Sequence, residues 1–235
     1  MNRRNFLLVV GATLALPAFA QSRPMKIGVI GSGRIGSTIG GLWVKAGHEV
    51  MFSDRDPDQV KRAIEGLGPE LRSKARSGSV PEAVAFGDAV LIAVPYGALP
   101  AIQQQVGAQL KGKVVIDPNN PVPSRDGELG AQAREKGAGV SSAALLPGAR
   151  IVRAFNSWGY GLMAREANRP APRMAIPVAA DDAAALKLGM QLVADAGFDP
   201  VPAGGLAASK AFDLGSPVSG RILTAEEMRK ALALK

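Results

Sequence analysis

Short, almost wholly apolar runs alternate with segments of helical periodicity along most of this chain. Residues 89–94, AVLIAV, are apolar throughout, which is typical of a strand in a parallel sheet that helices cover on both faces. Residues 35–46 instead carry an apolar stripe at helical spacing. Strands are predicted at residues 25–30, 49–52, 89–94, 114–116, 151–155, 174–178 and 198–201, and helices at residues 35–46, 57–64, 96–110, 128–136, 182–196 and 224–234. This alternation predicts an α/β protein with a doubly wound, mostly parallel sheet in a single domain.

A glycine-rich turn joins the first predicted strand to the first predicted helix. It matches the G-x-G-x-x-G pattern with Gly31, Ser32, Gly33, Arg34, Ile35 and Gly36. In that pattern the first glycine permits a tight turn, the second lets a pyrophosphate approach the backbone, and the third lets the helix pack on the sheet. Free N–H groups at the start of the helix would bind the phosphates. Because the strand–turn–helix context is the one that the pattern requires, the turn predicts a Rossmann-type dinucleotide site.

Three residues at the end of the second predicted strand bear on which dinucleotide binds. An acid there, such as Asp54, binds the ribose hydroxyls of NAD, whereas an arginine such as Arg55 accommodates the extra phosphate of NADP. Alternation along a strand places Ser53 and Arg55 on one side and Asp54 on the other. If strand geometry continues to Arg55, the pattern favours NADP, with NAD as the alternative.

Composition excludes several kinds of chemistry. The 235 residues contain no cysteine, which excludes disulfides, thiolate nucleophiles and cysteine-ligated metals. They contain one histidine, His48, so no metal site is predicted and a serine–histidine–aspartate hydrolase is disfavoured. The formal net charge is +8, but the basic residues are spread among acids, so we expect no nucleic-acid partner. A mildly basic surface suits a polyanionic small ligand.

Residues 1–20 have the layout of a secretory signal peptide. An arginine pair at residues 3–4 precedes an apolar run at residues 6–16, and the small residues at positions 18 and 20 suit cleavage after position 20. The arginine pair resembles the twin-arginine signal, which directs folded proteins across the bacterial inner membrane. We therefore expect export to the periplasm, without stable membrane insertion after cleavage. The mature part, residues 21–235, is expected to be a Rossmann domain with a C-terminal helical extension. The alternatives are a fortuitously basic start on an uncleaved anchor, or a cytoplasmic protein.

With these residues in view, the chain resembles the NADP oxidoreductases that depend on the deazaflavin coenzyme F-420. It is also similar to the NADPH-binding domain of STEAP-type ferric reductases. The resemblance extends from about residue 26 to about residue 206, and it rests on GSGRIGSTIG, AGHEV followed by SDR, LIAVPYGALP, GKVVIDPNNP, RIVRAFNS and DDAAALKLGMQLVADAGFDPV. Where family members typically carry Gly-Ser-Arg or a similar triplet, this chain has Ser-Asp-Arg at residues 53–55. Asp54 is therefore a departure from the family pattern.

The resemblance implies roles for residues that follow the ends of predicted strands. Ser53 and Arg55 would hold the 2′-phosphate of NADP. The positions beside the ribose and the nicotinamide would be Val94, Pro95, Tyr96, Asn119 and Asn120. The candidates for the acceptor pocket are Phe155, Asn156 and Trp158.

The expected reaction is hydride transfer between NADPH and a flavin or deazaflavin acceptor such as F-420. Such a transfer needs two rings held face to face, about 3–3.5 Å apart in a dry pocket, rather than a strong acid or base. No catalytic residue is singled out, because the sequence contains no evident acid–base constellation. A nucleotide-binding module without turnover, acting as a sensor or as an electron donor to a partner protein, is the alternative. Residues 212–235 are candidates either for capping the pocket or for contacts in a homodimer.

Overall fold

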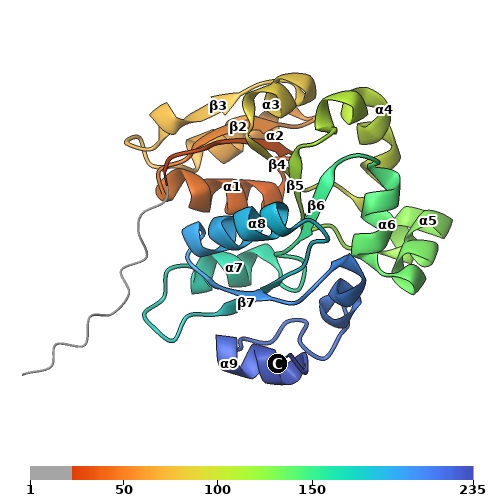
Figure 1. Ribbon diagram of the computed structural model, residues 1–235. Coiled ribbons are helices and arrows are strands. Elements are labelled where there is room, and N and C mark those ends of the chain that lie inside the picture. The colour runs from red at the N-terminus through yellow and green to blue at the C-terminus, as the bar shows by residue number, and fades with distance from the viewer. Residues whose placement is uncertain (1–22, 235) are drawn as a thin grey trace, which may run out of the picture.

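The structure is a computed structural model that describes residues 23–234. The predicted signal peptide, residues 1–20, lies outside the described residues. Figure 1 shows a central sheet with helices on both sides, and the C-terminal helix α9 lying beyond β7 at one end of the molecule. Within residues 23–234, none of the helices has the length and apolar character needed to span a bilayer.

Six parallel strands form the main sheet in the order β3-β2-β1-β4-β5-β6. The strands are β1 (Lys26–Ile30), β2 (Glu49–Ser53), β3 (Ala75–Ser77), β4 (Ala89–Ile92), β5 (Val114–Asp117) and β6 (Arg150–Arg153). The order reverses between β1 and β4, and open parallel sheets bind ligands at such a crossover, beyond the carboxyl ends of the strands. These pairings confirm the predicted doubly wound α/β fold.

Helices bury both faces of this sheet. On one face lie α1 (Arg34–Lys45), α2 (Pro57–Glu65) and α8 (Ala183–Asp195). On the other face lie α3 (Val80–Phe86), α4 (Leu99–Leu110) and α6 (Ala138–Leu145). Neighbouring strand residues therefore enter different cores: Val90 packs in one and Leu91 in the other. The unbroken apolar runs that predicted the strands follow from this double cover.

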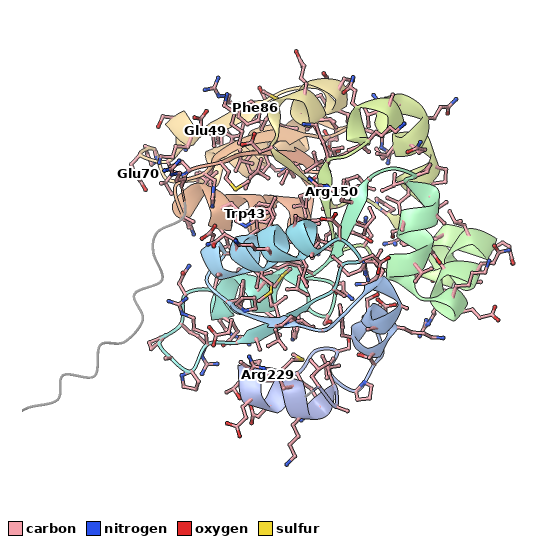
Figure 2. All side chains as sticks on the ribbon, viewed as in Figure 1. Trp43, Glu49, Glu70, Phe86, Arg150 and Arg229 are labelled. Atoms are coloured by element: carbon pink, nitrogen blue, oxygen red, sulfur yellow. The ribbon has the colours of Figure 1, made fainter. Side chains whose placement is uncertain are left out.

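Hydrogen bonds from the ring nitrogens of Trp43 and His48 connect the first strand–helix–strand unit to α8. Trp43 is fully buried, and its indole N–H donates to the carbonyl of Leu192, 2.8 Å away. Figure 2 shows Trp43 on α1, beside α8. His48 Nδ1 accepts a hydrogen bond from the Met25 N–H, so the proton is on Nε2, which donates to Asp195 at 3.1 Å. The only histidine of the sequence thus supports the fold.

The last two strands do not join the main sheet. β7 (Ala175–Val178) and β8 (Asp199–Pro202) form a separate two-stranded parallel sheet. An isolated antiparallel bridge between Arg153 and Ala179 connects this sheet to the end of β6. Both strands were predicted from the sequence, but periodicity identifies a strand and not the sheet in which it pairs.

The C-terminal extension packs on two parts of the molecule: its first helical segment lies against α6 and β6, and its last helix lies against the small sheet. It contains the 3₁₀ helix η3 (Leu206–Phe212) and α9 (Ala225–Ala231). A capping box begins α9: Thr224 accepts the Glu227 N–H, and the Glu227 carboxylate accepts the Thr224 N–H. The predicted C-terminal helix is confirmed, although it ends before residue 234.

Several short or bent elements escaped the sequence prediction. A segment of a few residues contains too few repeats for its period to be visible, as in β3, α3, α6, α7 (Tyr160–Glu166) and the 3₁₀ turn η1 (Arg72–Lys74). The helix predicted at residues 96–110 is confirmed, and its first residues form the 3₁₀ turn η2 (Tyr96–Ala98). α5 (Pro123–Lys136) starts earlier than predicted and is kinked at Gly127, where φ is 60°. Two predicted strands are shorter than their apolar runs, since β4 ends at Ile92 and β6 ends at Arg153. The residues released from those strands line the cleft described below.

Candidate functional site

The turn between β1 and α1 is closed by backbone contacts that only glycine allows. Gly31 has φ of +92°, and a Cβ there would collide with the carbonyl oxygen of Ala93. A Cβ on Gly36 would collide with the carbonyl oxygen of Gly31. Gly33 differs, because a Cβ there would meet no atom of the described residues within 4 Å. The open space over Gly33 is the cradle that the pyrophosphate of a dinucleotide needs.

Two hollows meet at this turn and form one cleft along the carboxyl edge of the sheet. The Asp54 hollow, about 310 Å³, also includes Arg55 and the start of α4. The Asn119 hollow, about 370 Å³, also includes Trp158. Both hollows are lined by Gly33, Ala93, Val94 and Pro95. Among the residues that the structure describes, no side chain caps the N-terminus of α1 and no acid lies in its first turn, so its N–H groups are available to an anion. These features fit a bound dinucleotide.

Asp54 reaches from the end of β2 back to the glycine turn. Its Oδ2 accepts the Ser32 N–H at 2.7 Å, and its Oδ1 accepts the Asp56 N–H at 3.0 Å. The Ser32 hydroxyl in turn donates to the carbonyl of Ser53 at 3.1 Å. Two backbone donors therefore hold the Asp54 carboxylate at the wall of its hollow.

The expectation that Ser53 and Arg55 point to the same side of the second strand is wrong. β2 ends at Ser53, so strand alternation does not extend to Arg55. The Ser53 side chain is fully buried, and its hydroxyl donates to the carbonyl of Val29 at 2.8 Å. The Ser53 side chain thus enters the core, whereas the carboxylate of the next residue, Asp54, faces the cleft. Arg55 is exposed and lines the Asp54 hollow.

Two asparagines follow β5 at the floor of the Asn119 hollow. Asn119 is 4% exposed, and its Oδ1 accepts the Val94 N–H at 3.1 Å, which joins the loops after β4 and β5. Asn120 Nδ2 donates to the carbonyl of Asn156 at 2.7 Å. Within residues 23–234, the buried Nδ2 of Asn119 and Oδ1 of Asn120 have no hydrogen-bond partner. Buried amide atoms of this kind are satisfied by a polar ligand or by water.

Val94 and Pro95 line both hollows, but Tyr96 does not. The Tyr96 ring is fully buried, and its hydroxyl donates to the carbonyl of Ala138 at 3.1 Å and accepts from Ser142 at 3.2 Å. This burial raises the pKa of Tyr96 to about 12. Tyr96 thus connects η2 to α6, and the expectation that it lies beside the nicotinamide is wrong.

Phe155 and Trp158 both line the Asn119 hollow. Phe155 has a φ of 62°, a left-handed value that bulky residues seldom adopt. Only 1% of Phe155 is exposed, and its ring makes edge-to-face contacts with Trp43 and Phe198 at centroid distances of 6.1 and 6.2 Å. The Phe155 ring, which we expected to border the place where the acceptor ring stacks, is therefore packed into the core. Trp158 is held by its indole N–H, which donates to a carbonyl of the C-terminal segment at 2.9 Å.

A buried ion-pair network that the sequence analysis missed lies beside the asparagine loop. Arg153 is fully buried, with Nη1 3.1 Å from Asp117 Oδ2 and Nη2 2.7 Å from Asp213 Oδ1. Arg153 Nη1 also donates to the carbonyl of Asn119 at 2.7 Å. Asn156 Nδ2 lies 3.3 Å from Asp213 Oδ1, so Asn156 belongs to this supporting network rather than to the cleft wall. The available signal was an arginine inside the apolar run IVRAF.

Two guanidinium groups flank the Asn119 hollow. Arg34, in the first turn of α1, lies over the ring of Tyr160 at 5.2 Å. Arg125 pairs with Asp126 at 2.8 Å and donates to the carbonyl of Asn120 at 2.9 Å. Sequence reasoning missed Arg125, because it lies ahead of the predicted start of its helix. The two cations make the rim of this hollow suitable for an anionic ligand.

Residues 26–121 match the family described as NADP oxidoreductase, coenzyme F420-dependent. The matched stretch contains the glycine turn, Asp54 and both asparagines of the cleft. Metalloreductase STEAP3 of Rattus norvegicus is 27% identical over 191 residues, which are 79% of this chain and 35% of that protein. Kynurenine 3-monooxygenase of Flavobacterium johnsoniae is 40% identical over 72 residues, which are 30% of this chain and 16% of that protein. The chain thus spans about a third or less of these curated relatives. The matched family indicates a nicotinamide nucleotide cofactor.

Solved structures share the fold. A hypothetical protein from Sinorhizobium meliloti superposes with a TM-score of 0.70 and 24% identity, covering 87% of this chain and 97% of that one. A protein described as a putative F420-dependent NADP reductase, from Arthrobacter sp. FB24, gives a TM-score of 0.62 and 23% identity, covering 80% of this chain and 88% of that one. At these identities the likeness establishes the Rossmann-type architecture.

Proposed function

We propose that this chain is an oxidoreductase that transfers hydride between a nicotinamide dinucleotide and a flavin or deazaflavin ring, with F-420 as one acceptor. The observation that carries the proposal is the continuous cleft from Asp54 over Gly33 to Asn119. The match of residues 26–121 to F420-dependent NADP oxidoreductases supports the acceptor class. A bound dinucleotide would supply the hydride that such an acceptor takes up.

The residues of the chain bind and orient the two rings. The first-turn N–H groups of α1 bind the pyrophosphate over Gly33. The unpaired Asn119 Nδ2 is placed to donate to a carboxamide oxygen, which would fix the orientation of the nicotinamide. Val94 and Trp158 form apolar walls that exclude water from the space between the rings. Positioning of this kind lowers the barrier without a catalytic acid or base.

The charge at the rim favours an acceptor that carries phosphate or carboxylate groups. Arg34 and Arg125 flank the Asn119 hollow, and Asp126 forms an ion pair with Arg125. A guanidinium fork suits phosphate and carboxylate oxygens. Of the candidate acceptors, FMN, FAD and F-420 all carry such groups.

Anaerobic turnover of the full chain with NADH and NADPH, each combined with FMN, FAD or F-420, tests the proposal. Oxidation of the dinucleotide together with reduction of one ring is the expected result. Trp158→Ala should slow ring reduction more than it weakens dinucleotide binding. Val140→Ser is the matched control, since Val140 is exposed on α6 and does not line the cleft. Tight dinucleotide binding without turnover of any ring would contradict the proposal.

Electron donation to a partner protein is the second candidate function. It is favoured by the length of the metalloreductase relative, of which this chain matches 35%. This function predicts dinucleotide binding without turnover of free rings, and turnover only after a redox partner is added. Co-purification followed by anaerobic oxidation assays with the purified partner would separate it from the first.

We also propose that the chain is exported after folding, with its dinucleotide bound. The support is the arginine pair and apolar run within residues 1–20. Cell fractionation of the full chain and of a variant with lysines at positions 3 and 4 tests this. The wild-type chain should appear in the periplasm and the variant in the cytoplasm, whereas an equal distribution would contradict export by this route.

A further inference from the structure

We propose that Asp54 makes this chain selective for NAD(H) over NADP(H), against the NADP preference named in the description of the family that residues 26–121 match. The inference rests on the dinucleotide site of the proposed function and names the dinucleotide that this site takes. The position of a single carboxylate relative to the glycine turn carries it.

The Asp54 carboxylate is fixed where the adenosine ribose of a dinucleotide would lie. Its Oδ2 is 2.7 Å from the Ser32 nitrogen and its Oδ1 is 3.0 Å from the Asp56 nitrogen. It shares its hollow with Gly31 and Gly33, over which the pyrophosphate would pass. An acid at the end of the second strand of such a unit binds the ribose hydroxyls. The structure therefore presents the ribose-binding form of this site already assembled.

The carboxylate retains capacity for the ribose. Each carboxylate oxygen has two lone pairs, and the structure assigns one backbone donor to each oxygen of Asp54. The 2′- and 3′-hydroxyls of an unphosphorylated ribose are two further donors that this group can accept. A 2′-phosphate removes one of these donors and brings a second anion to the same place.

The groups expected to hold a 2′-phosphate are not assembled. Ser53 is fully buried and its hydroxyl donates to the carbonyl of Val29 at 2.8 Å. Arg55 is the single cation among the residues that line the Asp54 hollow, and it lies beside two acids, Asp54 and Asp56. Arg62, on the next helix, lies 3.4 Å from Asp56. Each of these two acids is therefore matched by one cation, so a 2′-phosphate, with a charge near −2, would meet no net positive charge from these four groups.

Calorimetric titration with two probes tests the selectivity without involving the nicotinamide or any acceptor. The probes are ADP-ribose and 2′-phospho-ADP-ribose, and the protein is the full chain, freed of bound nucleotide. The wild-type chain should bind ADP-ribose at least about tenfold more tightly. Asp54→Asn keeps the side-chain shape and removes the charge, so it should weaken ADP-ribose binding and strengthen binding of the phosphorylated probe. Asp54→Ser should reverse the preference, and adding Arg55→Ala to it should abolish the gain.

Asp58→Asn is the matched control, because it removes a nearby exposed charge that does not line the hollow. The control should keep the wild-type ratio of affinities. Equal loss of both probes in Asp54→Asn would overturn the inference, since it would mean that Asp54 only braces the glycine turn. Wild-type preference for the phosphorylated probe would also overturn it. Selective ADP-ribose binding without hydride transfer would contradict the proposed function and support this inference, whereas binding of neither probe would overturn both.

Discussion

Arg153 and Asp213 are 60 positions apart in the chain, yet Arg153 Nη2 lies 2.7 Å from Asp213 Oδ1. This contact joins the end of β6 to the segment that follows η3. Because Arg153 also donates to the carbonyl of Asn119, the ion pair connects the C-terminal segment to the loop that lines the Asn119 hollow. The segment after η3 therefore helps to hold the loop that lines the Asn119 hollow, through its ion pair with Arg153.

Arg153→Met should destabilise the protein by about 3–5 kcal/mol, because it leaves the carboxylates of Asp117 and Asp213 without their buried partner. Arg150→Met is the control: Arg150 is 40% exposed and lies 3.5 Å from Asp182, so its loss should cost no more than about 1 kcal/mol. Urea unfolding of both variants measures the difference. Similar losses in the two variants would contradict a special role for the buried pair.

Substitution by alanine at two glycines of the turn should affect two different properties, stability at one glycine and dinucleotide binding at the other. Gly36→Ala places a Cβ against the carbonyl oxygen of Gly31, so it should lower the free energy of unfolding by about 1–3 kcal/mol or more. Gly33→Ala meets open space, so stability should change by less than about 1 kcal/mol, while dinucleotide binding should weaken at least about tenfold. Thermal unfolding and calorimetry test the pair. Unchanged binding in Gly33→Ala would place the pyrophosphate elsewhere.

Asn119→Asp should affect only the nicotinamide end of the ligand. The aspartate keeps an acceptor for the Val94 N–H but loses the Nδ2 donor that is unpaired among residues 23–234. Loss of one hydrogen bond of about 0.5–1.5 kcal/mol should weaken NADH binding up to about tenfold and leave ADP-ribose binding unchanged. Titration of both ligands measures this. An equal effect on both would show that Asn119 acts through the loop rather than on the carboxamide.

Asp126 should make the protein less stable in acid. Its hydrogen bond with Arg125, aided by the N–H groups of Val122 and Gly97, lowers the pKa of Asp126 from 3.8 to about 2. A folded-state pKa below the unfolded value stabilises the fold above the unfolded pKa, and this contribution is lost as the pH falls from about 4 to about 2. Unfolding free energies of the wild type and Asp126→Asn should therefore differ at neutral pH and converge near pH 2. A difference that stays constant with pH would contradict the assignment.

Much of the fold depends on patterns among residues that are close in the chain, so it could be predicted from the sequence. The apolar runs at β1, β4 and β5 identify buried parallel strands, because such strands have no polar face. The glycine spacing identifies the turn into α1, and the Asp56 cap identifies the start of α2, where its side chain accepts the Asp58 N–H. Each of these signals depends on residues that are neighbours in the chain.

The orientation of the site residues could not be predicted in this way. Whether Ser53 or Asp54 faces the cleft depends on where β2 ends, and β2 ends where the glycine turn supplies the Ser32 N–H to the Asp54 carboxylate. Tyr96 points into a core that forms only when α6 packs across η2. Partners such as these are distant in sequence, so no local pattern encodes them. The sequence by itself determined the alternating strands and helices and the glycine turn between β1 and α1. The tertiary structure decided which side chains line the cleft beside that turn, because that choice depends on long-range hydrogen bonds and packing.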